Sequence, residues 1–351
     1  MAAHRILLTG ANGYIASHIL FQLLSQPTPH SIRAVVRSQS KVDDVKALFP
    51  SASSKQLDFA IVPDMVKPGA FDEALKSDTP FDIVIHTASP CLYVASTGAK
   101  HFLEPAIKGT IEVLEGIQRV TVGSVKRVVL TSSFATVGAF GQVDETNKVY
   151  TEADWNPLTL DKAEANDDDA GLAYLASKKF AELAAWEVQK REGVRWDLVV
   201  LNPPMVYGPI LHKVNKMEEL NESVARFWNS FLKDRNTDAT LAPNEVDLYV
   251  DVRDIAHAHL LAMDAPNAGN QRFNTTAGAV TSQEIADILR AEVPGAVDRT
   301  PKGEPGKNTQ ADGAYTIDSN KARDVLGWTL RSAKETFADM GRQLLELEKS
   351  L

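Results

Sequence analysis

Residues 6–16 read Ile6-Leu7-Leu8-Thr9-Gly10-Ala11-Asn12-Gly13-Tyr14-Ile15-Ala16, and this segment decides the fold. Three apolar residues indicate a buried strand, and helical spacing that starts at Ile15 places a glycine loop between strand and helix. Gly10 permits a tight turn, Gly13 lets the backbone approach a diphosphate, and Ala16 allows close packing of helix on strand. The free amides of a helix N-terminus attract phosphate groups. An ordinary glycine turn is the alternative to the dinucleotide site that we expect here, formed by Gly10, Asn12, Gly13, Tyr14 and Ile15.

Short apolar runs alternate with helical patterns through the first 200 residues. Several runs are continuous, as expected for strands that are buried on both faces of a parallel sheet. This β-α-β-α order requires crossover connections and predicts an α/β fold of the Rossmann type, with a doubly wound parallel sheet. The six expected strands cover residues 6–8, 32–36, 59–62, 83–85, 128–130 and 198–201.

The alternation of apolar runs and helical patterns ends after Asn202, where a turn is expected because it is followed closely by Pro203, Pro204, Gly208 and Pro209. We predict that residues 1–202 form a Rossmann domain that binds the dinucleotide and carries the catalytic residues. Residues 203–351 are expected to form a smaller, mostly helical lobe that mainly binds substrate, with some segments returning to the Rossmann domain. The expected helices of this half cover residues 222–234, 252–263, 282–292 and 333–349.

Composition narrows the possible partners and the compartment. The 351 residues include 37 basic and 46 acidic side chains, a formal net charge of −9. A nucleic-acid-binding protein needs a basic surface, so this balance argues against such a partner. No apolar run approaches the roughly 18 residues of a membrane span. Cys91 is the only cysteine, which excludes internal disulfide bonds and cysteine-built zinc sites. We see no signal peptide and expect a cytoplasmic protein, for which a homodimer stays open.

The residues after the second expected strand select the cofactor. An NAD-binding protein places Asp or Glu here to accept hydrogen bonds from the ribose 2′-hydroxyl. This chain has Arg37 and Lys41 instead, and no carboxylate appears before Asp43. Because arginine offers a planar fork of donors to a 2′-phosphate, we expect NADPH rather than NADH. A solvated basic turn is the alternative. Asp64, after the third expected strand, is a candidate partner of the adenine or a helix cap.

Three polar side chains predict carbonyl chemistry. Tyr174 and Lys178 lie one helical turn apart on one face, where the ammonium group favours the phenolate form of the tyrosine. A phenol beside a cation can protonate a carbonyl oxygen while a hydride arrives at the carbon. The fifth expected strand runs into Thr131-Ser132-Ser133, at the sheet edge where ligands bind, so one of these hydroxyls can face the substrate. Taken singly, each feature also fits a surface contact or a local cap.

Together, these features resemble the extended short-chain dehydrogenase/reductases. More narrowly, the chain is similar to the fungal NADPH-dependent carbonyl reductases that reduce methylglyoxal and 3-methylbutanal, and to the plant dihydroflavonol reductases. The similarity covers nearly the whole chain. It is carried by Val62-Pro63-Asp64, His86-Thr87-Ala88-Ser89-Pro90, Val129-Leu130-Thr131-Ser132-Ser133, Tyr249-Val250-Asp251-Val252-Arg253-Asp254 and residues 202–209 and 318–328.

The resemblance implies a role for each matching residue. Ser133 polarises the carbonyl group, Tyr174 is the acid, and Lys178 binds the nicotinamide ribose and favours the phenolate. Arg37 and Lys41 bind the 2′-phosphate. Further implied cofactor contacts are Asp64, Met65, Thr87, Ala88, Ser89, Pro203 and Val206. The implied substrate-facing positions are Cys91, Phe134 and Met205. We expect aromatic residues at all three positions in the yeast-type reductases, and Cys91 and Met205 depart from that pattern.

We expect an NADPH-dependent reductase of aldehydes and ketones that needs no metal. His257 and His259 are two residues apart on an expected helix, so they point to different faces and lack the spacing of a metal pair. Phe227 and Phe231 either line a lid over the substrate or pack in the core. The alternatives are an NAD-dependent sugar-nucleotide epimerase or dehydratase, which Arg37 disfavours, and a non-catalytic NADP-binding regulator, which would not need the serine, tyrosine and lysine together.

Overall fold

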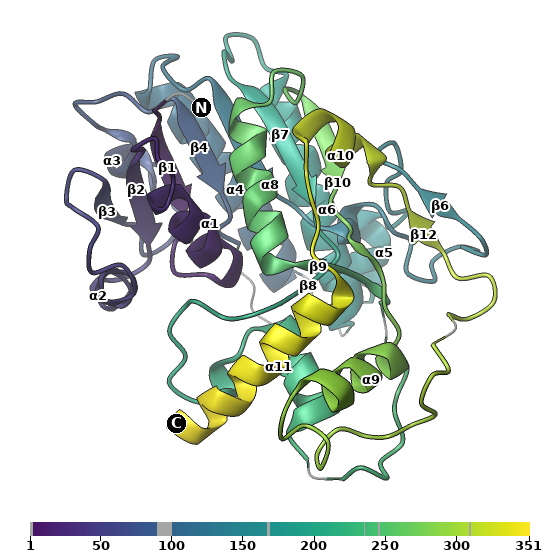
Figure 1. The fold of residues 1–351 in the computed structure, drawn as a ribbon. Helices are drawn as coiled ribbons and strands as arrows, with labels where there is room; N and C mark the ends of the chain where they lie inside the picture. The colour runs from purple at the N-terminus through teal and green to yellow at the C-terminus, as the bar shows by residue number, and fades with distance from the viewer. Residues whose placement is uncertain (1–2, 90–99, 167–168, 235, 245, 309) are drawn as a thin grey trace.

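A seven-stranded parallel sheet forms the centre of the protein, in the order β10-β7-β5-β4-β1-β2-β3. The computed structural model describes residues 3–89, 100–166, 169–234, 236–244, 246–308 and 310–351 (Figure 1). The strand order reverses beside β1, so the sheet is doubly wound and the predicted Rossmann-type fold is confirmed. The strands are β1 (Arg5–Thr9), β2 (Ser31–Val36), β3 (Leu57–Ile61), β4 (Ile83–His86), β5 (Arg127–Thr131), β7 (Asp197–Asn202) and β10 (Gln271–Asn274).

Helices cover both faces of this sheet (Figure 1). Successive side chains of a strand point to opposite faces, so Ile6 and Leu8 join one hydrophobic core while Leu7 joins the other. All three are fully buried, which explains why the strands read as continuous apolar runs. One face packs against α1 (Tyr14–Leu24), α2 (Gln39–Leu48), α8 (Val252–Asp264) and α10 (Asn320–Leu326). The other packs against α3 (Asp72–Leu75), α4 (Lys100–Val120) and α6 (Ala170–Gln189).

The seventh strand, β10, was not predicted from the sequence. Its four residues include Arg272 and Asn274, so the segment lacks the apolar run that marks the other strands. It pairs with β7, more than 65 residues earlier in the chain, through the register Gln271 opposite Val199. Together with α8 and α10, it shows that the chain after residue 203 is shared between the large sheet and the smaller lobe.

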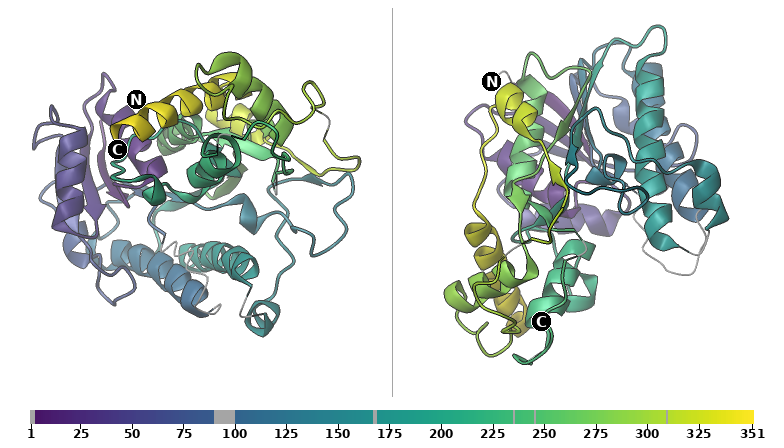
Figure 2. Two further views of the ribbon diagram at one scale, coloured as in Figure 1. Left: turned by 90° about the horizontal axis from the view of Figure 1, so that it is seen from below. Right: turned by 90° about the vertical axis from the view of Figure 1, so that its right-hand side faces the viewer.

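The smaller lobe has its own core and lies below the sheet (Figure 2). Its aromatic centre includes Tyr207, Phe227 and Phe337. The helix expected over 222–234 is shorter than predicted, because it widens into a π-helical turn at Trp228–Leu232. The lobe is built from β8 (Met205–Tyr207), α7 (Glu222–Phe227), β9 (Leu248–Asp251), β11 (Gly278–Ala279), α9 (Ser282–Glu292) and α11 (Ala333–Ser350).

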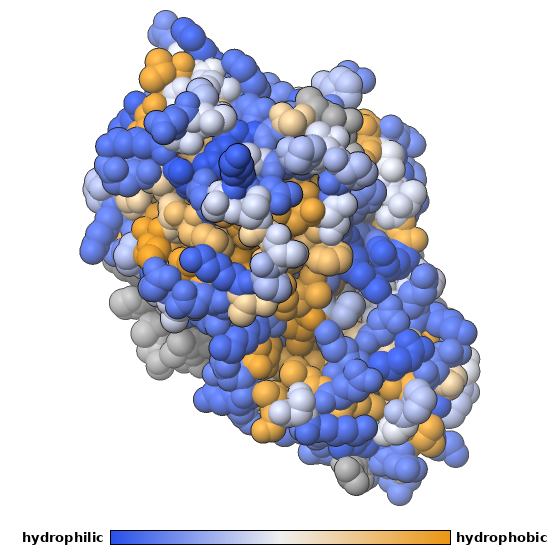
Figure 3. All heavy atoms as spheres, turned by 60° about the vertical axis from the view of Figure 1, so that its left-hand side comes forward, coloured by the Kyte–Doolittle hydropathy of each residue, from blue (hydrophilic) through white to orange (hydrophobic). Residues whose placement is uncertain are grey.

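Apolar side chains gather in the hollow between the large lobe and the small one (Figure 3).

A small two-stranded sheet flanks the large one, formed by β6 (Val149–Tyr150) and β12 (Thr316–Ile317), with α5 (Leu160–Ala165) nearby in the chain. Single 3-10 turns lie at Phe134–Thr136 and Met217–Glu219. Over the described ranges, none of the helices combines the length and the apolar character that crossing a bilayer requires.

Candidate active site

The glycine loop after β1 has the geometry of an anion site. Gly10 has a φ of +66°, and a Cβ at this residue would lie 3.0 Å from the Cα of Ala88. Gly13 starts α1, and no side chain caps the amides of its first turn. Ala16 is buried behind the loop, as expected from its packing role. These amides and the positive end of the helix dipole can therefore receive a phosphate group.

A second cavity of about 440 Å³ lies beyond the loop, between α2 and residues 212–219. Arg37 and Lys41 both line it, beside Asn12. Lys41 pairs with Asp44 over 2.9 Å, and Lys213 of the smaller lobe pairs with the same carboxylate over 3.1 Å. Arg37 is exposed and forms no ion pair with any residue of the described part of the chain. It is therefore available to an external anion.

His212 also lines this second cavity, and no sequence motif predicted it. Its Nδ1 atom is buried without a hydrogen-bond partner among the described residues. Burial lowers the pKa of His212 to about 4, with His18 and Lys41 adding to the effect, so the ring is neutral at pH 7. His212 and Lys213 come from the smaller lobe, and both lobes therefore line this cavity.

Asp64 and Met65 line neither of the two cavities. Asp64 accepts a hydrogen bond from the amide of Val66 over 3.2 Å, which is a local turn. Met65 packs against the second core and approaches Gly109. The predicted adenine contact of Asp64 and the predicted cofactor contact of Met65 therefore stay predictions.

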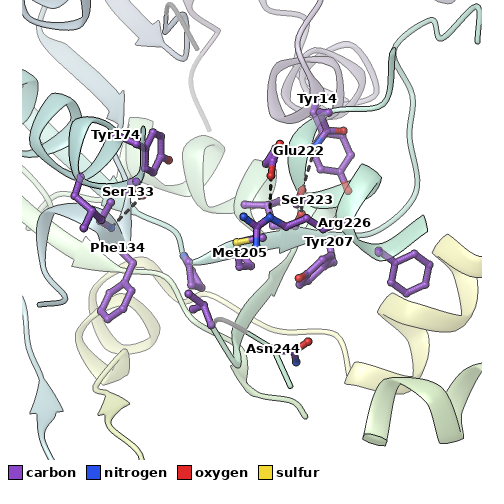
Figure 4. A pocket seen from close by; sticks show the side chains of 18 of the residues that line it. Tyr14, Ser133, Phe134, Tyr174, Met205, Tyr207, Glu222, Ser223, Arg226 and Asn244 are labelled. Atoms are coloured by element: carbon purple, nitrogen blue, oxygen red, sulfur yellow. Dashed lines mark hydrogen bonds and ion pairs between the residues drawn. The ribbon is translucent and has the colours of Figure 1, made fainter. Parts of the chain in front are cut away.

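Ser133 and Tyr174 line the main cavity, which has a volume of about 870 Å³ and reaches the glycine loop. Ser133 is the second residue after the end of β5 and accepts a hydrogen bond from the amide of Ala135 over 3.1 Å. Tyr174 lies on α6, whose N-terminus is capped by Asp169. In Figure 4 the two side chains lie on the same wall of the pocket, together with Phe134. The structure thus brings together two residues that lie 41 positions apart in the sequence.

Lys178 lies one turn after Tyr174 on α6. Its Nζ atom is 5.7 Å from the centroid of the tyrosine ring and donates a hydrogen bond to the Oγ of Ser89 over 3.0 Å. Thr87 and Ala88, in the same loop, bond to Thr9 at the end of β1. The loop after β4, which contains the implied cofactor contacts Thr87, Ala88 and Ser89, therefore lies between the glycine loop and Lys178.

His86, at the end of β4, lies beneath this region and is 1 % exposed. Burial, with a smaller contribution from the charge of Lys178, lowers the pKa of His86 to about 4. His86 shares a hydrogen bond of 2.8 Å with Thr9, so it acts as a neutral support of the loop.

Apolar side chains form most of the main cavity's wall. Phe134 is 1 % exposed and packs edge-on against Phe140 with ring centroids 5.5 Å apart. Met205 lies between the Ser133 wall and the opposite side, which carries Tyr14 and Arg226 (Figure 4). Val206 lines the cavity, whereas the carbonyl of Pro203 accepts a hydrogen bond from the amide of Phe134, and the predicted cofactor contacts of both residues stay predictions. Cys91 lies outside the described residues.

Apart from Tyr14 of α1, the opposite side comes from the smaller lobe, and most of its residues were not predicted from the sequence. Arg226 pairs with Glu222 over 2.8 Å, and Ser223 donates to the carbonyl of Val206 over 2.6 Å. Phe227 and Phe231 line the cavity and also pack in the lobe's core, which confirms their packing role, whereas a lid over the substrate stays a prediction. The polar start of α7, at Asn221, was the one available signal, and only tertiary packing places it at the cavity.

The two histidines of α8 have separate environments. His259 is fully buried, shares a 2.6 Å hydrogen bond with Thr131 and contacts the carbonyl of Ile255 over 2.8 Å. Burial lowers its pKa to about 4. Within the residues that the structure describes, no group of three or more His, Cys, Asp or Glu is arranged to hold a metal ion.

Comparisons with known proteins agree with this geometry. The ketoreductase azaE of Aspergillus niger is 36% identical over 347 residues, covering 98% of both chains. The NADPH-dependent methylglyoxal reductase GRE2 of Saccharomyces cerevisiae is 33% identical, again over 98% of both chains. The crystal structure of yeast methylglyoxal/isovaleraldehyde reductase Gre2 complexed with NADPH matches with a TM-score of 0.86 over 99% of this chain and all of that one.

These similarities confirm the resemblance to the extended short-chain dehydrogenase/reductases. A family model matches residues 6–275, from the first strand to the end of the seventh, and thus covers the glycine loop, Ser133, Tyr174 and Lys178. The chain belongs to the NAD dependent epimerase/dehydratase family.

Proposed function

We propose that this protein reduces aldehydes and ketones to alcohols with NADPH. The observation that carries the proposal is the meeting of Ser133 and Tyr174 on one wall of the main cavity, with Lys178 one helical turn away. Relatives over nearly the whole chain are named as a ketoreductase and as an NADPH-dependent methylglyoxal reductase.

The residues present fit this cofactor. A side chain at Gly10 would fill the space beside Ala88, and the uncapped amides of α1 suit a diphosphate. Arg37 and Lys41 line the second cavity and would hold the 2′-phosphate, with Lys213 and His212 facing them from the smaller lobe. When it is bound, NADPH supplies the hydride.

The chain's own residues handle the carbonyl oxygen and its proton. Ser133 accepts from the amide of Ala135, which leaves its hydroxyl hydrogen for the carbonyl oxygen of a substrate. Tyr174 donates the proton as negative charge develops on that oxygen. The ammonium group of Lys178, whose Nζ atom lies 5.7 Å from the centroid of the tyrosine ring, would balance the negative charge that remains on the phenol oxygen.

The cavity wall favours substrates with an apolar body. Phe134, Phe140 and Met205 lie near the proposed reacting position, and Phe227 and Phe231 close the far side. The whole cavity, about 870 Å³, is larger than a three-carbon aldehyde needs even with the nicotinamide inside it. We therefore place medium-sized ketones and aldehydes, aromatic or branched, among the preferred substrates.

A turnover assay tests the proposal. The purified protein is incubated with NADPH and a panel containing methylglyoxal, 3-methylbutanal and aryl ketones, and the loss of NADPH absorbance is followed. We expect turnover with several members of the panel. A protein that binds NADPH and turns over none of them would be a regulator, and one that is purified with bound NAD and is inactive with NADPH would be an epimerase or dehydratase.

A further inference from the structure

A buried carboxylate lies directly behind the active site. Glu182 on α6 is 1 % exposed and pairs with Arg272 of β10 over 2.6 Å. It also accepts hydrogen bonds from Ser132 over 2.5 Å, from Asn202 over 2.8 Å and from Trp186 over 3.2 Å. Both carboxylate oxygens are therefore fully engaged, by donors from four different segments of the chain.

Arg272 is held just as completely. Its guanidinium group donates to the hydroxyl of Thr136 over 2.9 Å and to the carbonyls of Glu152 and Asp154 over 2.8 and 2.9 Å. Its outer face stacks on the ring of Trp155, 3.7 Å from the centroid. The charge of Glu182 therefore has a fixed counter-charge, and a rotamer change in either side chain would break several of these bonds.

This network holds the elements that carry the proposed catalytic residues. Ser132 directly precedes Ser133, and Asn202 also donates to the backbone carbonyl of Ser133 over 3.2 Å. On α6, Glu182 follows Lys178 by one turn and Tyr174 by two. Glu182 thus ties the backbone at Ser133 to the helix that carries Tyr174.

Stability alone is a weak reason for such a pair, because well-packed apolar residues often stabilise a core as well as a buried ion pair does. An ion pair with several directional hydrogen bonds does something that apolar packing does not, since it fixes the position of one element against another. A misplacement of about 1 Å between reacting groups can reduce the rate of an enzyme about 100-fold.

We propose that Glu182 is a positioning residue for carbonyl reduction, which sets the distance between Ser133 and the Tyr174–Lys178 pair through its bonds to Ser132, Asn202 and Arg272. The inference rests on the proposed function of those three residues. It places the determinant of catalytic geometry outside the cavity, because Glu182 does not line it.

The chain offers a matched control. Arg127 and Asp197 form another arginine–carboxylate pair, with two bonds of 2.7 and 2.8 Å, and Arg127 also binds carbonyls at the end of α8. Arg127 and Asp197 are the first residues of β5 and β7, whereas Ser132 and Asn202 lie at the other ends of the same strands. The control pair therefore joins the same two strands at the edge that is remote from the active site.

The experiment compares Glu182→Gln with Asp197→Asn, each assayed well below its own melting temperature. Both variants are expected to melt earlier than the wild type, because each leaves a buried arginine without its charge partner. Only Glu182→Gln is expected to lose kcat, by roughly 10- to 100-fold, while its Kd for NADPH, measured by fluorescence, changes less than about twofold. An unchanged kcat in Glu182→Gln, or an equal loss in Asp197→Asn, would overturn the proposal.

Ser132→Ala keeps the inference testable if Glu182→Gln does not fold. It removes one hydrogen bond to Glu182 and should lower kcat roughly threefold to tenfold, with KM nearly unchanged; a wild-type kcat would again overturn the proposal. Tyr174→Phe separates the two hypotheses. If it is inactive while Glu182→Gln turns over normally, only the positioning role fails. If Tyr174→Phe stays active, the assignment of Tyr174 as the acid fails, and if the wild type turns over no aldehyde or ketone, the proposed function itself fails.

Discussion

Replacing Arg37 by alanine should change the cofactor preference of the enzyme. Arg37 is the cation of the second cavity that has no carboxylate partner in the described part of the chain. Lys41, by contrast, shares Asp44 with Lys213, and these two lysines lower the pKa of Asp44, with Lys41 having the larger effect. Part of the charge of Lys41 is therefore already neutralised, so Arg37 is expected to contribute most to holding a 2′-phosphate.

The size of the effect follows from the exposure of this side chain. A hydrogen bond to a charged group contributes about 1.5–3 kcal/mol, and Arg37 belongs at the lower end because solvent screens its charge. A loss of about 1.5–2 kcal/mol corresponds to a roughly 10- to 30-fold increase in the Kd for NADPH. The Kd for NADH, which lacks the phosphate, should stay within about twofold of the wild-type value.

Titration of the protein's fluorescence with each cofactor measures both constants. Asp44→Asn is the matched control, because it removes a negative charge from the same cavity and should strengthen NADPH binding while leaving NADH binding unchanged. Equal weakening of NADPH and NADH in Arg37→Ala would show that the residue acts on the fold of the loop. No weakening of NADPH would show that the 2′-phosphate binds elsewhere.

Three further predictions concern the loop, the pocket and the far edge of the sheet. Gly10→Ala should lower the free energy of unfolding by at least about 1–2 kcal/mol and weaken NADPH binding, because the φ of Gly10 is +66° and an added Cβ would press on Ala88. Thermal melting with and without NADPH measures both effects, and an unchanged melting temperature would contradict this prediction. Met205→Phe should raise the KM for bulky aryl ketones roughly tenfold and leave that for methylglyoxal unchanged, whereas a uniform rise would remove Met205 from the substrate pocket. His4 bonds Asp82 and Asp264, which raise the pKa of His4 to about 9 against the effect of burial. The contribution of His4 to the stability of the protein should therefore be complete below about pH 6.5 and vanish as the pH rises through 9. A stability difference between wild type and His4→Gln that does not shrink as the pH rises would contradict this prediction.

The large sheet could be predicted from the sequence because its strands are buried on both faces. A strand such as Ile6–Leu7–Leu8 needs apolar residues at every position, and this pattern is local in the sequence. The seventh strand lacks it because Arg272 and Asn274 carry polar side chains, which bond to Glu182 and to the carbonyl of Asp318. The hydrogen bonds of these polar side chains of β10 form only in the folded protein, so no local sequence pattern predicts them.

Some residues of the candidate site could likewise be predicted from local motifs, and others could not. Gly10, Ser133, Tyr174 and Lys178 lie in short motifs whose chemistry depends on local spacing, and the structure places all four around the main cavity or next to it. The wall from the smaller lobe depends on how α7 packs against β8 through the bond from Ser223 to Val206. That contact spans 17 residues of irregular chain, which leaves no periodic signal in the sequence.

The turnover of Tyr174→Phe tests the central claim most directly, because this change removes only the hydroxyl that is proposed to donate the proton. The kcat for the best aldehyde or ketone should fall at least about 100-fold, the scale of general acid catalysis. The Kd for NADPH should stay within about twofold of the wild-type value, since the ring and Lys178 remain in place. A variant that binds NADPH normally and keeps most of its turnover would contradict the assignment of Tyr174 as the acid.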